Sequence, residues 1–150
     1  MNKKRPTADM EKFLSYRLSI ISRLINRRST RYFNENYGLT LAEWRALAQI
    51  AAGKMNTVKA ISEQTFSDKG LISRAITSLE KKGLIEGTPN PKDKRSMEYK
   101  LSAVGISIHD EIMPMRMEEN ALIAEIMTPE ELELFKDVLA RIQGHLNALD

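Results

Sequence analysis

Residues 67–81 hold side chains whose types and spacing suit contact with a polyanion. Small, hydroxyl-bearing and cationic residues share one face at about 100° per residue, and no acidic residue lies on that face. The set comprises Gly70, Ser73, Arg74, Thr77 and Lys81, with Ser67, Asp68 and Lys69 on the first turn. A helix that reads the major groove of DNA needs small groups near its N-terminus and cations that meet phosphate. Gly70 leaves room, and Arg74 has the reach and planar fork for a guanine. An ordinary solvated face is the alternative interpretation, because polar outer faces are normal.

The same segment carries signals for the two ends of a helix. Ser67 stands where an N-cap belongs, Asp68 suits the positive end of the dipole, and Gly83 closes the segment. The inner face repeats apolar residues at helical spacing, which predicts that it is buried. These residues are Ile72, Ala75, Ile76 and Leu79.

A second basic group follows, between two predicted strands at residues 84–88 and 96–101. Prolines and an asparagine rigidify the connection, which reads Pro89, Asn90, Pro91, Lys92, Asp93, Lys94 and Arg95. Three cations at a stiff tip suit the phosphates beside a minor groove. We expect Asp93 to orient a nearby arginine, since an unpaired acid there would repel phosphate. A solvated charged turn is the alternative.

The order of elements from Thr57 to Leu101 is a winged helix-turn-helix: a helix to about Gln64, a turn, the helix after Ser67 and the hairpin. A long helix is predicted before it, from about residue 9 to residue 36, and ends at Gly38. Three more helices are predicted. The first begins at a Thr40–Glu43 capping box and ends near Ala52. The second runs from Ser102 to about Met127 with a kink at Pro114, and the start of the third is marked by Thr128, Pro129 and Glu131.

Four segments, in order and at matching spacing, closely resemble the MarR family of bacterial transcription regulators. They are YGLTLAEWRAL at 37–47, SDKGLISRAI at 67–76, LEKKGLI at 79–85 and NPKDKRS at 90–96. The resemblance covers about residues 10 to 150, and Asp93 and Arg95 meet the wing signature of the family. Gly87 departs from it, because relatives often carry a basic residue there. Gly105 matches a family glycine, although it follows Ser-Ala-Val rather than the Thr-Pro or Thr-Ala of many members.

The resemblance implies a mainly α fold with a small β-hairpin wing and N- and C-terminal dimerisation helices. We expect one structural domain with three regions: a dimerisation helix at 1–36, the DNA-binding winged helix-turn-helix at 37–101 and dimerisation helices at 102–150. The last helix carries a heptad seam of Leu132, Phe135, Leu139, Ile142, Leu146 and Leu149. Leu14 and Leu18 of the first helix join it as expected interface residues. An intrachain core stripe is the alternative for the seam.

Charge is distributed unevenly along the chain. Residues 1–36 hold nine Lys and Arg against three Asp and Glu, residues 37–101 eleven against seven, and residues 102–150 three against ten. The basic parts can face double-stranded DNA, whereas the acidic C-terminal part is unsuited to approach it. Together with the resemblance, this leads us to expect a ligand-responsive repressor that binds a pseudo-palindromic operator as a homodimer. An architectural nucleic-acid binder without a ligand is one alternative. A membrane-surface helix protein is another, but the apolar stripe of the first helix favours burial.

Two groups of residues are candidates for binding the effector of such a regulator. The family often takes small aromatic acids or related phenolics between its dimer helices and its DNA-binding lobe. Candidate wall residues near the junction of the first two helices are Tyr16, Tyr32, Tyr37, Trp44 and Arg45, although such aromatics also suit a core. Arg23, Arg27 and Arg31 step by four and form one row. That row is either solvated or neutralised by acids, or it binds an anionic effector such as an aromatic carboxylate or its coenzyme A thioester.

Other chemistries have little support. The chain has no cysteine, and His109 and His145 stand far apart, so we expect neither a metal site nor a cofactor. Both histidines suit a surface or an interface. No nucleophile elbow or glycine-rich phosphate loop is present, so an enzyme is not expected. The basic start at residues 1–6 lacks a following apolar segment, and no apolar run approaches the roughly 20 residues of a membrane span. These features predict a cytoplasmic protein.

Overall fold

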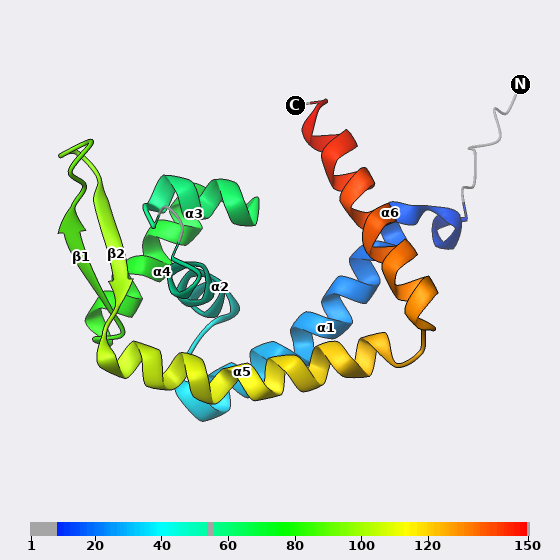
Figure 1. Ribbon diagram of the computed structural model, residues 1–150, viewed down its shortest axis with the longest axis horizontal. Coiled ribbons are helices and arrows are strands. Elements are labelled where there is room, and N and C mark those ends of the chain that lie inside the picture. The colour runs from blue at the N-terminus through cyan, green and yellow to red at the C-terminus, as the bar shows by residue number, and fades with distance from the viewer. Residues whose placement is uncertain (1–8, 54–55, 150) are drawn as a thin grey trace, which may run out of the picture. The chain divides into compact units, whose positions relative to one another are not determined.

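The computed structural model describes residues 9–53 and 56–149 and shows a helical protein with one β-hairpin (Figure 1). Its elements are η1 (Met10–Lys12), α1 (Leu14–Tyr37), α2 (Leu41–Ala51), α3 (Val58–Thr65), α4 (Lys69–Lys81), β1 (Ile85–Pro89), β2 (Met97–Leu101), α5 (Ala103–Ala124) and α6 (Pro129–Asn147). The predicted class, mainly α with a hairpin wing, is confirmed. The basic segment at residues 1–6, which contributed to the prediction of a cytoplasmic protein, lies outside the described residues.

The chain divides into two compact units, one ending at His109 and the other beginning at Asp110. The first unit contains the helix-turn-helix formed by α3 and α4, the hairpin, and the helices α1 and α2. The region boundaries expected at residues 36 and 101 both fall inside this unit and stay predictions.

The first helix begins later than the sequence pattern indicated. A short 3-10 turn, η1, takes up Met10–Lys12, and extended backbone at Phe13 (φ −83°, ψ 125°) separates it from α1. The predicted start near residue 9 is therefore wrong, because the Asp9 side chain caps the short turn rather than α1. The end is as predicted: Gly38 takes a left-handed φ of 62°, and its N–H donates to the carbonyls of Phe33 and Asn34.

The N-cap of α4 is Asp68 and not Ser67. Asp68 Oδ1 accepts a hydrogen bond of 2.9 Å from the N–H of Leu71, whereas the Ser67 hydroxyl donates back to the carbonyl of Thr65. The preceding turn explains the difference, because Phe66 takes a left-handed φ of 49° and moves the start of the helix one residue along. The inner face of α4 is buried as predicted, at Ile72, Ala75, Ile76 and Leu79. Full burial of each large aliphatic side chain contributes about 1.5–3 kcal/mol.

The hairpin pairs β1 with β2 in an antiparallel register from Ile85 opposite Leu101 to Pro89 opposite Met97. The first strand thus begins at Ile85 rather than Leu84 and includes Pro89, which the sequence analysis assigned to the turn. A proline is tolerated at the end of an edge strand, where no partner needs its missing N–H. The N–H of Tyr99 donates to the carbonyl of Asn56 at 3.0 Å, so β2 is also tied to the segment before α3.

The start of α5 is held against the hairpin at a position where only glycine fits. A Cβ added to Gly105 would lie 1.9 Å from the backbone oxygen of Leu84. The hydroxyl of Ser102 donates to the carbonyl of Gly83 at 2.6 Å and accepts from the N–H of Gly105 at 3.0 Å. The family glycine at 105 is therefore required by close approach of two backbones. Beyond it, α5 continues through Pro114 and ends at Ala124 rather than Met127.

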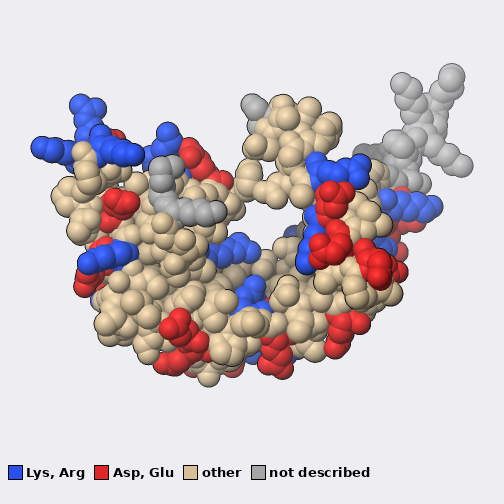
Figure 2. Space-filling model, viewed as in Figure 1, with Lys and Arg blue, Asp and Glu red and all other residues tan. Residues whose placement is uncertain are grey.

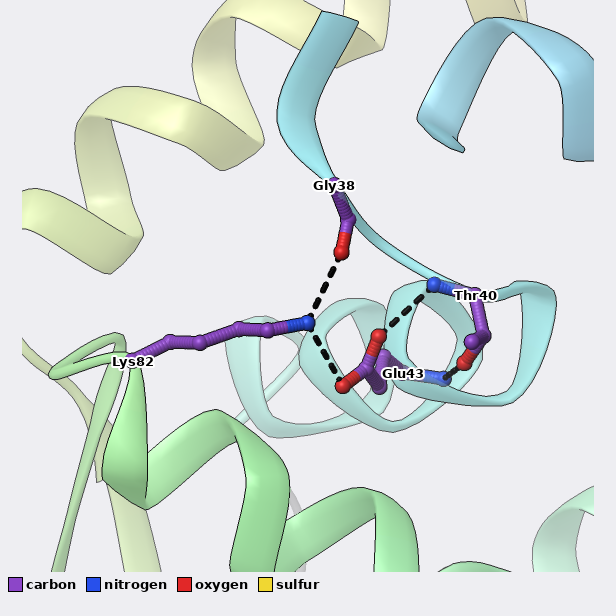
Figure 3. A network of polar contacts seen from close by, with 4 residues as sticks. All are labelled: Gly38, Thr40, Glu43 and Lys82. Atoms are coloured by element: carbon purple, nitrogen blue, oxygen red, sulfur yellow. Dashed lines mark hydrogen bonds and ion pairs between the residues drawn. The ribbon is translucent and has the colours of Figure 1, made fainter. Parts of the chain in front are cut away.

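A buried carboxylate joins three helices at one point (Figure 3). Glu43 is 3% exposed, and its Oε2 accepts the N–H of Thr40 at 2.7 Å to complete the predicted capping box of α2. Its Oε1 lies 2.8 Å from Lys82 Nζ, which also donates to the carbonyl of Gly38 at 2.8 Å. Burial raises the pKa of Glu43, but hydrogen bonds from Lys82, Ser78 and the Thr40 backbone, with the charge of Lys82, lower it below 4.5 overall.

Candidate nucleic-acid interface

The outer face of α4 is open to solvent. Its exposed residues are Asp68, Lys69, Ser73, Arg74, Thr77 and Lys81, while Gly70 is half-buried. A Cβ added to Gly70 would lie 3.3 Å from Arg74 Nη1 and 3.1 Å from Asp68 Oδ1. The guanidinium of Arg74 therefore lies back over the first turn, which is the part of a recognition helix that comes closest to base edges.

Several polar groups of this face are already used by the helix itself. The Asp68 carboxylate caps the backbone, and the hydroxyl of Thr77 donates to the carbonyl of Ser73 at 3.0 Å. Ser67 is half-buried and bonded to Thr65. Of the residues predicted to contact DNA on α4, Lys69, Arg74 and Lys81 thus present exposed cationic groups.

Two exposed apolar residues beside this face were missed by the sequence analysis. Phe66, in the turn before α4, is 66% exposed, and Leu71, on the first turn, is 41% exposed. An apolar side chain at a recognition helix can contact the methyl group of thymine. The available signal was that Leu71 lies off the core stripe of Ile72, Ala75 and Leu79.

The tip of the hairpin gathers cations on a backbone held by short-range hydrogen bonds. Figure 2 shows blue side chains clustered at this tip. Lys92, Lys94 and Arg95 are all exposed. Asp93 Oδ1 accepts the N–H of Arg95 at 3.0 Å, and the carbonyl of Asp93 accepts the N–H of Ser96 at 3.0 Å. Asp93 was expected to orient an arginine, and its carboxylate holds the backbone of Arg95 rather than the guanidinium.

Glycine at position 87 is explained by packing within the hairpin. Gly87 lies opposite Tyr99, and a Cβ there would come within 2.9 Å of the tyrosine ring carbon Cε1 and 3.1 Å of Met97 Cε. The buried tyrosine ring takes the space that a side chain at position 87 would need. Burial raises the pKa of Tyr99, and the charge of Glu80 raises it further. A side chain at position 87 would therefore displace the Tyr99 ring from the base of the wing.

The predicted row of arginines lines one hollow on α1. Arg23, Arg27 and Arg31 share it with Asn26, Thr30, Asn34 and Glu35, and its volume is about 470 Å³. Arg45 of α2 reaches the same place, because its Nη2 donates to Asn26 Oδ1 at 3.3 Å. The structure thus brings together four of the arginines assigned to effector binding.

The aromatic residues assigned to the same site do not join the hollow. Trp44 is buried, with its ring centroid 5.2 Å from that of Phe33 and 5.8 Å from that of His109. Tyr32 packs on Phe33 and Tyr37. Tyr16 borders a separate hollow near Glu11 and Arg17. His109, expected at a surface or an interface, is half-buried and stacked on Trp44.

Apolar residues expected at a dimer interface are largely open to solvent. Leu14, Leu18, Phe135, Leu139, Leu146 and Leu149 are exposed, and Leu132 and Ile142 are half-buried. Within the described ranges, no three His, Asp or Glu side chains gather in a way that could hold a metal ion. No helix in the described part of the chain is long and apolar enough to cross a membrane.

Comparison with known proteins shows what this part of the chain is similar to. The MarR family profile matches residues 37–96. The regulator SarZ of Staphylococcus aureus (strain USA300), described as an HTH-type transcriptional regulator, is 28% identical over 99 residues. That alignment covers 66% of this chain and 66% of the length of SarZ.

Two solved structures share the fold. The S. aureus MepR–DNA complex superposes with a TM-score of 0.80 at 20% identity, covering 89% of this chain and 98% of MepR. PcaV from Streptomyces coelicolor, solved in complex with its natural ligand, superposes with a TM-score of 0.74 at 16% identity, covering 93% of this chain and 98% of PcaV. Fold and sequence together define a winged helix-turn-helix protein with cations exposed on α4 and on the hairpin tip. The chain is similar to the MarR family over residues 37–96.

The wing generates the first prediction. Arg95→Ala should weaken binding to every duplex and make the salt dependence shallower by about one unit of slope per lost phosphate contact. Asp93→Ala should act in the same direction, because it releases the turn that carries Arg95. Both are measured by fluorescence anisotropy across a salt series, with Asp137→Ala, an exposed acid on α6, as the control. Tighter binding by Asp93→Ala would show that its charge only repels DNA.

Proposed function

We propose that this protein is a DNA-binding transcription regulator, a repressor that binds a pseudo-palindromic operator as a homodimer and releases it on binding a small anionic effector. The observation that carries the DNA-binding role is the exposed, cation-bearing face of α4 in the same compact unit as a basic hairpin tip. The match of residues 37–96 to the MarR family profile supports it, as does the fold shared with MepR, which was solved with DNA. The location that goes with this proposal is the cytoplasm.

The proposed recognition of DNA combines base contacts with phosphate contacts. Arg74, lying over the first turn of α4, is suited to a bidentate bond with a guanine, and Gly70 lets the backbone come close to the groove. Lys69 and Lys81 on α4, with Lys92, Lys94 and Arg95 on the wing, are suited to phosphate, which gives affinity and position without sequence information.

The second prediction tests base reading. Duplexes are first selected by the wild-type protein from a random-sequence pool. Arg74→Ala should then lose about 1–3 kcal/mol on the selected duplex and flatten the preference at one position of each half-site. Arg95→Ala is the comparison, since a phosphate contact should weaken selected and random duplexes alike. Equal losses by Arg74→Ala on both duplexes would reassign this arginine to the backbone, and a wild type that selects nothing would favour an architectural binder.

The homodimer is supported by apolar side chains that one copy leaves exposed. On α6 the exposed residues Phe135, Leu139 and Leu146 follow one another at steps of four and seven residues, and on α1 they include Leu14 and Leu18. A seam of this kind is buried when two helices pack together. Two recognition helices related by twofold symmetry then read the two half-sites of the operator.

The third prediction concerns this seam. The double substitution Leu139→Asp, Ile142→Asp places charges at its centre, so the dimer should dissociate and operator binding should be lost while helical content stays largely intact. Sedimentation velocity measures the mass and circular dichroism the helix. The double substitution Lys136→Ala, Arg141→Ala, at exposed positions of the same helix, makes the same change of −2 in net charge and is the control. A dimer of unchanged mass would overturn the seam.

The arginine hollow on α1 is the proposed effector site. Like charges spaced four apart repel by a few tenths of a kcal/mol per pair, and an anion bound in the hollow would offset this repulsion. The ligand class that fits is an aromatic carboxylate or the phosphates of its coenzyme A thioester. Release of DNA requires that the effector bind more tightly to the DNA-incompetent spacing of the two α4 helices, because equal affinity for both spacings shifts nothing.

The fourth prediction tests this site. A panel of aromatic acids and their coenzyme A thioesters is screened by thermal shift and then by competition with the selected duplex. The double substitution Arg27→Ala, Arg31→Ala should leave DNA affinity near wild type and abolish release by any compound that acts on the wild type. Arg28→Ala, the neighbouring arginine outside the hollow, should retain release. If the double variant still releases DNA at the effector concentration that acts on the wild type, the effector site lies elsewhere.

A further inference from the structure

The recognition helix is tied to α1 by one side chain. Lys82 is the C-cap residue of α4, and Gly38 is the C-cap residue of α1. The Lys82 ammonium donates to the Gly38 carbonyl at 2.8 Å and contacts the Glu43 carboxylate at 2.8 Å (Figure 3). Because α4 packs chiefly on α2 and α3, and α1 packs on α2 and η1, this lysine is a direct polar link between α1 and α4.

Breaking the Glu43–Lys82 ion pair costs free energy because the carboxylate is buried. The Glu43 side chain is 4% exposed, whereas that of Lys82 is 36% exposed. If Lys82 were lost, a buried carboxylate would remain without its cation, and the remaining partners are the backbone of Thr40 and the hydroxyl of Ser78. Alternative orientations of α4 that separate Lys82 from Glu43 are disfavoured for the same reason. The pair therefore selects one arrangement of α4 on α1 and α2.

We propose that Lys82 is a positioning residue that transmits the orientation of α1 to the recognition helix and so sets the half-site spacing that the dimer reads. Lys82 need not touch DNA to do this. It acts on α4 from the end opposite Arg74, and the face that carries Arg74 moves with the helix. The part of this inference that concerns spacing rests on the proposed DNA-binding function, whereas the link between α1 and α4 does not.

The link is tested without DNA. The chain has no cysteine, so spin labels can be placed at Arg28→Cys on α1 and Ser73→Cys on α4, both exposed. Labelled protein is diluted into unlabelled protein, and the distance distribution between the two labels is measured by pulsed electron resonance. Lys82→Met should broaden the distribution. Lys136→Met removes a lysine at the same 2.8 Å from its carboxylate, but its partner Glu133 is 74% exposed, so its distribution should match that of the wild type.

A loss of stability alone must be separated from a loss of position. Ile76→Val trims the buried face of α4 without touching the ion pair, and it should lower the melting temperature while leaving the distribution narrow. If Lys82→Met fails to fold, Glu43→Gln takes its place, because the amide oxygen can still cap Thr40 while the charge is removed. A Lys82→Met or Glu43→Gln protein that is folded and gives the wild-type width would overturn the link.

Spacing is tested on the duplex that the wild type selects and on a version with one base pair inserted between the half-sites. Lys82→Met should lower the ratio of the two dissociation constants by at least about fivefold, the lower end of the usual range for coupling between two sites. Lys136→Met should keep the ratio. A broadened distribution with an unchanged ratio would overturn the role in spacing and leave the link. Failure of the wild type to select any duplex would contradict the proposed function. The distance distribution between the spin labels would still test the link between α1 and α4, because that measurement needs no DNA.

Discussion

A carboxylate that is buried where helices meet needs a partner, and the pairing of Glu43 with Lys82 constrains the rest of the DNA-binding unit. One oxygen of Glu43 caps the start of α2, and the other holds the cation that closes the ends of α1 and α4. Uncompensated burial of this charge would cost several kcal/mol. The three helices are therefore fixed together by the requirement that one charge be satisfied, while the apolar residues of α2 and α4 supply most of the favourable burial.

The local signals in the sequence predicted the elements well, and the failures have physical reasons. The Thr40–Glu43 capping box and Gly38 act over a few residues, so they could be read directly. Ser67 and Asp68 are both good N-cap residues, and the choice between them depends on Phe66, which takes a left-handed conformation that aromatic residues seldom adopt. The role of Lys82 could not be read, because its carboxylate partner lies 39 residues earlier in the chain.

The candidate site shows the same division between local and distant causes. Helical spacing was sufficient to place the outer face of α4 and the row of arginines on α1, because each lies on one helix. Trp44 could have served a ligand wall or a core, and only the packing of Phe33 and His109 against it decides for the core. Glycines 87 and 105 each leave space for a group that is distant in sequence, the Tyr99 ring and the Leu84 backbone. Such requirements become visible only when the partner is placed.

The charge distribution makes the orientation of α4 important for specificity. Phosphate contacts supply sequence-independent affinity, and this chain balances its cations so closely with acids that its net charge is only +3. Half of those acids lie in residues 102–150, outside the helix-turn-helix and wing. Under the proposed function, selectivity depends on a few base contacts from the first turn of α4, each of which weakens steeply when its donor is misplaced. We expect a helix with so few base contacts to need a fixed position at its other end, which is where Lys82 donates to the carbonyl of Gly38.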